Sequence, residues 1–307
     1  MKELFKNMGP AGQLAIFLLL IVLGLIAAGI ITLVITGTAT EKNDTLIYVQ
    51  GLSQIAMFLL PSLVFAWLFH DKAGSYFQTK VQKWQWASVI VAVAIMITAI
   101  PMVDYLTTWN ENMHMPESLG KWEEEMRKSQ ALSQELLNGF LSRPGIGNMI
   151  VNLTVLAAIP AVCEEFVFRG VVQKTLVGWF RNPHVAIATT AAVFSLTHFE
   201  PFYFVPRFVL GIVLGYIFYH TRTIWASALA HFTNNALIVL LTYGHNAGLF
   251  SADPQNIQLP YPAAFAIGSL LVTILLLIFI TIIGKKDAQK SKKNKTAQND
   301  TLMASTN

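Results

Sequence analysis

Residues 147–170 of the chain are GNMIVNLTVLAAIPAVCEEFVFRG. The part up to Cys163 is mostly apolar and is typical of a membrane-spanning helix, whereas Glu164, Glu165 and Arg169 follow it directly. A charge inside a bilayer is costly, and a span can end without a glutamate pair. The stretch therefore predicts a transmembrane helix whose three charged residues have a function.

The composition of the whole chain agrees with a membrane protein. Hydrophobic residues make up 54% of it and charged residues 12%, whereas a soluble domain has about 25% charged residues. The single cysteine excludes an intrachain disulfide and a Cys-rich metal site. We therefore expect an all-α fold, a polytopic integral membrane helical bundle of about eight transmembrane helices. The expected spans are Leu14–Thr36, Leu46–Phe69, Trp86–Leu106, Gly147–Cys163, Val185–Thr197, Phe204–Tyr219, Ile224–Tyr243 and Ala263–Ile283.

The pattern of apolar and polar residues divides the chain into five parts. Leu119, Trp122, Met126, Leu136 and Phe140 recur at roughly helical spacing, which predicts an amphipathic helix on the outer membrane surface. A substrate gate is the other interpretation of this helix. The expected parts are N-terminal transmembrane helices (1–110), an extracytoplasmic amphipathic segment (111–146), catalytic core helices (147–245), a last transmembrane helix (246–284) and a Lys-rich, disordered cytoplasmic tail (285–307).

Lysine and arginine in the short loops predict the orientation. With the N-terminus inside, the cytoplasmic side holds Lys72, Lys80, Lys83, Arg169, Lys174, Arg181, Arg222 and the Lys-rich tail, whereas the long outside loop is an exception that holds Lys121, Arg127, Lys128 and Arg143. We therefore expect both termini in the cytoplasm. The tail is an orientation signal rather than a nucleic-acid site, because it has no aromatic residue on which a base could stack.

Helix geometry separates the two glutamates. Glu165 and Arg169 are four residues apart, so they share a helix face and can form an ion pair. Glu164 is rotated by about 100° from Glu165 and faces elsewhere, where it is free for chemistry. Pro160 removes a helical hydrogen bond one turn earlier and predicts a kink, which membrane helices tolerate where they line a cavity.

Two further groups of polar residues occur on apolar segments. FSLTH places His198 at the end of a short span, and HFTNN places His231 and Asn235 on one face of another. These residues support two routes to amide hydrolysis. Glu164, His198 and His231 could hold a zinc ion with a bound water. Alternatively, Glu164 and His198 activate the water directly, and His231 and Asn235 donate hydrogen bonds to the oxyanion.

One difficulty concerns the distance between these groups. With the spans as expected, His198 lies toward the outer end of its helix, far from Glu164 near the cytoplasmic end of Gly147–Cys163. The two residues can meet only if the fourth helix continues past Arg169 or if the fifth helix begins after Val185.

The three motifs together resemble a known family. EEFVFR fits E-E-x-x-x-R, FSLTH fits F-x-x-x-H and HFTNN fits H-x-x-x-N. This ordered set is similar to that of the CPBP family, which comprises the type II CAAX prenyl endopeptidases and bacterial Abi-like relatives linked to bacteriocin processing and self-immunity. The resemblance covers Glu164–Asn235.

The resemblance implies an intramembrane endopeptidase that acts on a membrane-associated protein or peptide, either as a metalloprotease or through glutamate alone. It implies that Glu164 activates water, with Glu165, Arg169, His198, His231 and Asn235 completing the catalytic set. We expect a bacterial inner-membrane location. A transporter or proton pathway and a non-catalytic immunity or scaffold protein remain the alternatives, and the sequence leaves the substrate, the zinc ion and the oligomeric state open.

Overall fold

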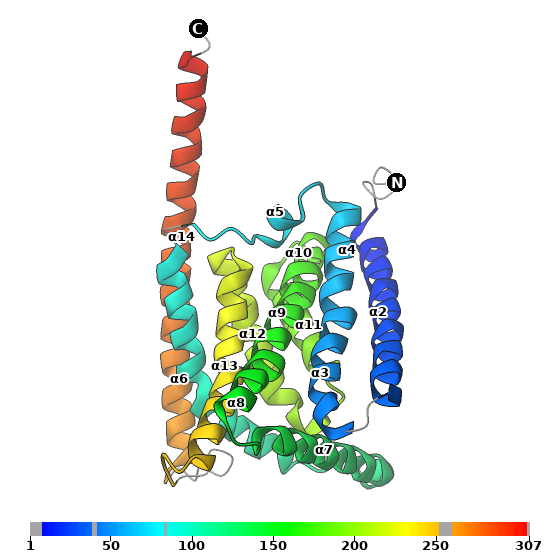
Figure 1. Cartoon of the computed structure of the whole chain (residues 1–307). Coiled ribbons are helices and arrows are strands. Elements are labelled where there is room, and N and C mark those ends of the chain that lie inside the picture. The colour runs from blue at the N-terminus through cyan, green and yellow to red at the C-terminus, as the bar shows by residue number, and fades with distance from the viewer. Residues whose placement is uncertain (1–7, 39–41, 83–84, 252–259, 306–307) are drawn as a thin grey trace.

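The computed structural model describes residues 8–38, 42–82, 85–251 and 260–305 as a bundle of helices (Figure 1). Seven of these helices are long and apolar enough to cross a membrane. The fifth expected span, Val185–Thr197, corresponds to the shorter apolar helix α11 (Pro183–Leu196). An all-α polytopic membrane bundle is therefore confirmed. The other long elements are α2 (Pro10–Thr38), α3 (Lys42–Gln54), α4 (Leu60–Phe69), α6 (Trp86–Glu111), α7 (Gly120–Leu141), α12 (Phe204–Thr221), α13 (Ile224–Asn246) and α14 (Pro262–Ser305).

A single helical rod of 35 residues, Ile146–Phe180, runs through the middle of the bundle. It consists of α8 (Ile146–Asn152), the π-helical segment η4 (Leu153–Ala158), α9 (Ile159–Glu165), the π-helical segment η5 (Phe166–Gln173) and α10 (Lys174–Phe180). The π-helical segment η4 ends two residues before Pro160, and such an irregularity is often found at functional sites.

The expected end of this span at Cys163 is wrong. The helix continues to Phe180, so Glu164 and Glu165 lie near its middle rather than at its end. The polar side chains beyond Cys163 do not need water, because they find partners in the protein. Lys174, for example, donates to the backbone carbonyl of Tyr76. Hydropathy alone treats such residues as the end of a span.

The turn α5 (Ala73–Phe77) packs against this central helix on the side where α2 begins and α14 ends (Figure 1). Phe77 is buried, and its ring lies 4.6 Å from the ring of Phe166. A Cβ atom on Gly170 would come within 2.7 Å of the Phe77 ring, so only glycine allows this packing. The turn α5 thus covers the central helix on this side of the bundle.

Helix α7 crosses the opposite side of the bundle, roughly perpendicular to the spans (Figure 1). Glu123 holds the N-terminal end of α7 in place. Its carboxylate accepts hydrogen bonds from the backbone N–H of Met115 and from Arg127, and it contacts His114. These contacts hold the pKa of Glu123 down at about 2. Arg127 also donates to the carbonyls of Glu111 and Met113, which ties α7 to the end of α6.

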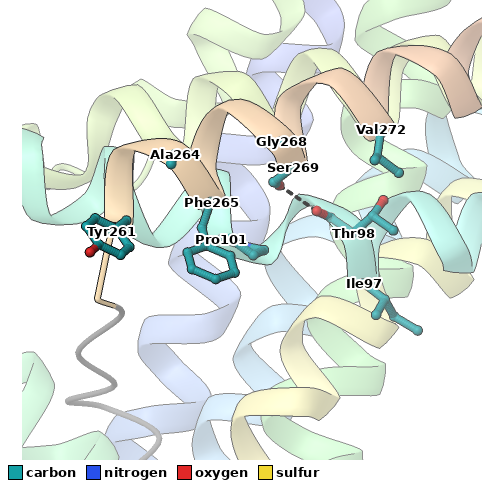
Figure 2. Close-up of a pocket in the computed structure, with 9 residues that line it drawn as sticks. All are labelled: Ile97, Thr98, Pro101, Tyr261, Ala264, Phe265, Gly268, Ser269 and Val272. Carbon is teal, nitrogen blue, oxygen red and sulfur yellow. Dashed lines mark hydrogen bonds between the residues drawn. The ribbon is translucent and has the colours of Figure 1, made fainter.

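Helices α6 and α14 are joined by hydrogen bonds of Ser269 beside Pro101 (Figure 2). Ser269 on α14 accepts from the backbone N–H of Met102 at 3.2 Å and donates to the carbonyl of Thr98 at 2.5 Å. The hydroxyl therefore stands between the two backbone groups of one helical turn, beside Pro101. A side chain inserted in this way provides hydrogen-bond partners for the backbone groups of an interrupted helical turn.

We expected the tail to be disordered from residue 285, but the structure describes its backbone as a helix. Helix α14 continues without a break to Ser305 and extends beyond the bundle (Figure 1). Lysine, glutamine and alanine, which dominate this segment, are good helix formers. Adding residues to an existing helix avoids the cost of nucleation. The membrane-spanning part of α14 therefore favours continuation of the helix into the tail.

Candidate active site

Glu165 and Arg169 form the buried ion pair that their spacing predicts. Arg169 Nη1 lies 2.6 Å from Glu165 Oε1, and both side chains are fully buried. The guanidinium also donates through Nη2 to the carbonyl of Gly211 on α12 at 3.0 Å. Its Cζ lies 5.1 Å from the ring centroid of Phe194 on α11. A buried charge is stable only when it is paired and hydrogen-bonded, and three helices provide these contacts.

His231 on α13 stands between the two glutamates. Its Nδ1 lies 3.1 Å from Glu165 Oε1, and its Nε2 lies 3.8 Å from Glu164 Oε2. An ionised carboxylate can only accept a hydrogen bond, so Nδ1 carries the proton in this contact. In the neutral imidazole the lone pair is then on Nε2, which faces Glu164. This arrangement of carboxylate and histidine fixes the tautomer and the ring orientation.

Glu164 differs from Glu165 in its surroundings, as the helix geometry predicts. It is 7% exposed, whereas Glu165 is fully buried. In the described part of the chain its one ion-pair contact is with His231, and no arginine neutralises it directly. Glu164 therefore has carboxylate oxygens that are free to bind a small polar molecule.

His198 lies at the end of α11, where its side chain is held by its own helix. Its Nδ1 lies 2.8 Å from the carbonyl of Phe194, and because a carbonyl only accepts, Nδ1 is the protonated nitrogen. Nε2 is left with a free lone pair. In the described ranges no hydrogen bond or ion pair joins His198 to Glu164. The central helix does continue past Arg169, as one of the two expected solutions requires, and the Phe194 ring contacts the rings of both His198 and His231.

Phe194, the first residue of the FSLTH motif, connects the separate motifs. Its ring meets the rings of His198 and His231 edge-on, with centroids 5.0 and 6.1 Å apart, and it lies against Arg169. The aromatic position of the F-x-x-x-H motif thus packs against the polar residues of all three motifs. Its spacing to His198 was a usable signal, but only the fold shows what the ring contacts.

Asn235 lies one turn beyond His231 and is partly exposed. Its Oδ1 accepts from Asn234 Nδ2 at 3.2 Å. In the part of the chain that the structure describes, its own amide N–H groups form no hydrogen bond with either glutamate or with His198. The amide is therefore near His231 on the same helix and retains donors for another molecule.

Two residues near the ion pair were missed from the sequence. The carbonyl of Gly211 accepts from Arg169, and Ser227 lies beside the Glu165 carboxylate, one turn before His231. The G-x-x-x-G spacing of Gly211 and Gly215 was a usable signal, since small residues at this spacing allow membrane helices to approach closely.

The residues expected to bind zinc only partly fit such a site. The free Nε2 atoms of His198 and His231, each with Nδ1 bonded to an acceptor, match the usual state of metal-binding histidines. However, among the described residues no three His, Cys, Asp or Glu side chains lie close enough together to hold a metal ion. The side chains as arranged do not form a complete zinc site.

Comparison with known proteins relates one part of the chain to a known family. No curated protein and no solved structure matches the chain. The family described as type II CAAX prenyl endopeptidase Rce1-like matches residues 146–237, from the start of the central helix to just beyond Asn235. This range contains all six expected site residues and supports a CAAX-protease-like intramembrane endopeptidase. Residues 146–237 are thus similar to the domain of the Rce1-like type II CAAX prenyl endopeptidases, a family of membrane proteases.

Proposed function

We propose that this protein cleaves a peptide bond of a membrane-associated protein or peptide by means of a water molecule activated by Glu164. The observation that carries this proposal is the position of His231, whose Nδ1 is held by Glu165 while its Nε2 faces Glu164. A carboxylate that no arginine pairs with directly, beside an oriented imidazole, is a suitable pair for general acid–base chemistry. Both groups lie within membrane-spanning helices, where polar residues are rarely placed without a function.

The reaction divides into two proton transfers. Glu164 takes a proton from water, and the water oxygen attacks the carbonyl carbon of the scissile peptide bond. The carbonyl oxygen becomes an oxyanion. The protonated Glu164 then gives its proton to the amide nitrogen, the C–N bond breaks, and a carboxylic acid and an amine are released. No co-reactant other than water is needed.

Arg169 and Glu165 act on this reaction through His231. Arg169 neutralises Glu165, which keeps the carboxylate ionised in a buried place. Glu165 then holds the proton of His231 on Nδ1 and orients the ring toward Glu164. Glu165 thus supports the reaction as a positioning residue, and Glu164 carries the proton.

His198 and Asn235 complete the proposed site. The free Nε2 of His198 is a second acceptor for the attacking water. The free amide N–H groups of Asn235 supply hydrogen bonds to the oxyanion, a contribution that is often large in acyl transfer. A neutral His231 has its one proton on Nδ1, which donates to Glu165, so it can donate to the oxyanion only as an imidazolium.

We further propose that the protein lies in the inner membrane of a bacterial cell, with both termini in the cytoplasm. The side on which α2 begins also carries the α4–α6 connection and the turns after α10 and α12 (Figure 1). Lys72, Lys80, Arg181 and Arg222 lie in these connections, and positive charge favours the cytoplasmic side. Fusion of a reporter that is active only in the cytoplasm to the C-terminus tests this orientation.

The central experiment is cleavage of a library of membrane-bound peptides, prenylated and unprenylated, by the purified protein in nanodiscs. We expect the wild type to cleave and Glu164→Gln to be inactive while remaining folded. Glu124→Gln is the matched control, because Glu124 lies on α7 and pairs with Lys128. Glu164-dependent ion flux in proteoliposomes without any cleavage would favour a transporter instead. Binding of peptides without cleavage, unchanged in Glu164→Gln, would favour a scaffold.

A further inference from the structure

One buried polar side chain beside the site belongs to none of the three motifs. Gln173 is the last residue of the π-helical segment η5, four residues after Arg169, and it is 2% exposed. Its Nε2 donates to the carbonyl of Gly215 on α12 at 3.0 Å. A buried glutamine in a membrane-spanning helix needs such a partner, and here the partner is the backbone of another helix.

Gln173 and Arg169 make the same contact one turn apart. Arg169 Nη2 donates to the carbonyl of Gly211, and Gln173 Nε2 donates to the carbonyl of Gly215, each at 3.0 Å. The two acceptors are also four residues apart, on one face of α12. A single hydrogen bond would allow η5 to rotate against α12. Two bonds fix both the position of η5 along the α12 axis and its rotation.

Glycine makes this pair of bonds possible. A Cβ atom on Gly211 would come within 2.9 Å of Ala191 Cβ, and one on Gly215 within 2.8 Å of Ile187 and 3.0 Å of Gln173 Oε1. The bare backbone of α12 therefore approaches both α11 and η5 closely. The carbonyls become reachable for Arg169 and Gln173 because of this close approach.

The π-helical form of η5 gives the two bonds a specific task. A π-helical segment is rare and is frequently found at functional sites. Arg169 lies inside this segment, whereas its partner Glu165 is the last residue of α9. The two bonds to α12 hold this irregular segment, and Arg169 with it, against a second helix.

We propose that Gln173 is a positioning residue of the candidate active site, and this inference rests on the proposed peptidase function. By bonding to Gly215 it fixes the rotation of η5 and hence the position of the Arg169 guanidinium. Arg169 holds Glu165, and Glu165 orients His231 toward Glu164. Gln173 itself contacts none of the reacting groups.

The test compares Gln173→Met with a matched control, Gln85→Met. Gln85 is also buried, and its Nε2 donates to the carbonyl of Thr221 on the same helix α12, but it lies away from the ion pair. Both changes remove one buried glutamine–carbonyl bond at similar volume, and Gln85→Met also removes the bond that Gln85 Oε1 accepts from the backbone N–H of Gln82. Both full-length variants are purified in nanodiscs, and kcat, KM and the apparent melting temperature are measured.

We expect Gln173→Met to lower kcat about ten- to a hundredfold, the usual effect of losing a residue that orients a catalytic group. KM should stay within about twofold, because binding surfaces are not altered. Gln85→Met should lower the melting temperature comparably and leave kcat within about twofold. Equal kcat values for Gln173→Met and the wild type, or an equal loss in Gln85→Met, would overturn the inference.

A double-mutant cycle tests the same inference without an activity assay. The effect of Gln173→Met on the melting temperature should differ clearly between the wild type and Arg169→Met, whereas the effect of Gln85→Met should be the same in both. Additive effects for Gln173 and Arg169 would reject the coupling. If no protein cleaves, the wild type included, the proposed function fails, and the cycle still decides whether Gln173 positions Arg169.

Discussion

The Nδ1 atom of His231 lies 3.1 Å from the Oε1 atom of Glu165, although 66 residues separate them in the chain. The same carboxylate oxygen is bound by Arg169 at 2.6 Å. One oxygen thus joins a cation on the central helix to an imidazole on α13. The opposite nitrogen of that imidazole faces Glu164, so the two adjacent glutamates are joined through His231 and have different tasks.

The two glutamates should respond differently to the same substitution. Glu165→Gln removes the partner of a fully buried arginine, and breaking a buried pair costs about 3–5 kcal/mol of the free energy of unfolding. Glu164→Gln leaves that pair intact and should change the melting temperature little while abolishing cleavage. Thermal unfolding and peptidase assays on both variants check this. Equal melting temperatures for the two variants would contradict the assignment of the ion pair.

Metal content distinguishes the two chemical routes through the site. We measure zinc in the purified wild type, Glu164→Gln and His198→Ala by mass spectrometry, with peptidase activity on the same samples. We expect cleavage that persists in chelator and is lost in Glu164→Gln, as a water activated by glutamate alone requires. Near-stoichiometric zinc in the wild type, lost together with activity in both variants, would instead establish a metalloprotease whose side chains rearrange to bind the ion.

The close approach of α11 and α12 should depend on Gly211. Gly211→Ala places a methyl group 2.9 Å from Ala191 Cβ and should destabilise the protein by about 1–3 kcal/mol, the usual cost of overpacking. Ala191→Gly in the same chain should restore part of this loss, because it removes the nearest atom. The melting temperatures of the two single variants and the double variant measure this. A double variant no more stable than Gly211→Ala would argue against this contact.

The attachment of α7 should be sensitive to acid. Contacts from the Met115 N–H, Arg127 and His114 lower the pKa of Glu123 from an ordinary value of 4.5 to about 2. A carboxyl whose pKa is lowered in the folded state adds stability above its ordinary pKa and loses this contribution as the pH falls toward the folded value. We therefore expect the attachment to weaken between pH 4.5 and about 2.

Hydrogen exchange in the α6–α7 connection measures this attachment. Exchange at Met115 should speed up as the pH falls through this window, after correction for the intrinsic pH dependence of exchange. Glu123→Gln should show fast exchange already at pH 7. Glu124→Gln is the control, because Glu124 contacts Lys128 on the same helix and does not reach the connection. Exchange that is equally slow in Glu123→Gln and the wild type would show that other contacts hold α7.

Much of the fold was predictable from local properties of the sequence. Apolar runs near the length of a bilayer predict the spans, because helices alone satisfy their backbone groups in lipid. The pairing of Glu165 with Arg169 follows from a spacing of four residues on a helix. The amphipathic helix at 120–141 follows from its periodicity. Each of these features depends on residues that are close together in the chain.

The remaining features depend on residues that are far apart in the chain. Hydropathy ended the fourth span at Cys163, whereas partners on other elements, such as the Tyr76 carbonyl for Lys174, allow it to continue to Phe180. Spacing placed His231 with Asn235 but could not show that it faces both glutamates. The carbonyls of Gly211 and Gly215 have no sequence signal of their own as acceptors.

By itself, the sequence of this protein determined which segments cross the membrane and which residue types are available for chemistry. The tertiary structure decided which of these residues meet. The physical reason is the cost of burying a polar group without a partner. That cost requires Glu165, Arg169 and Gln173 to have partners, but the partners lie on α12 and α13, and only the packing of the helices selects them.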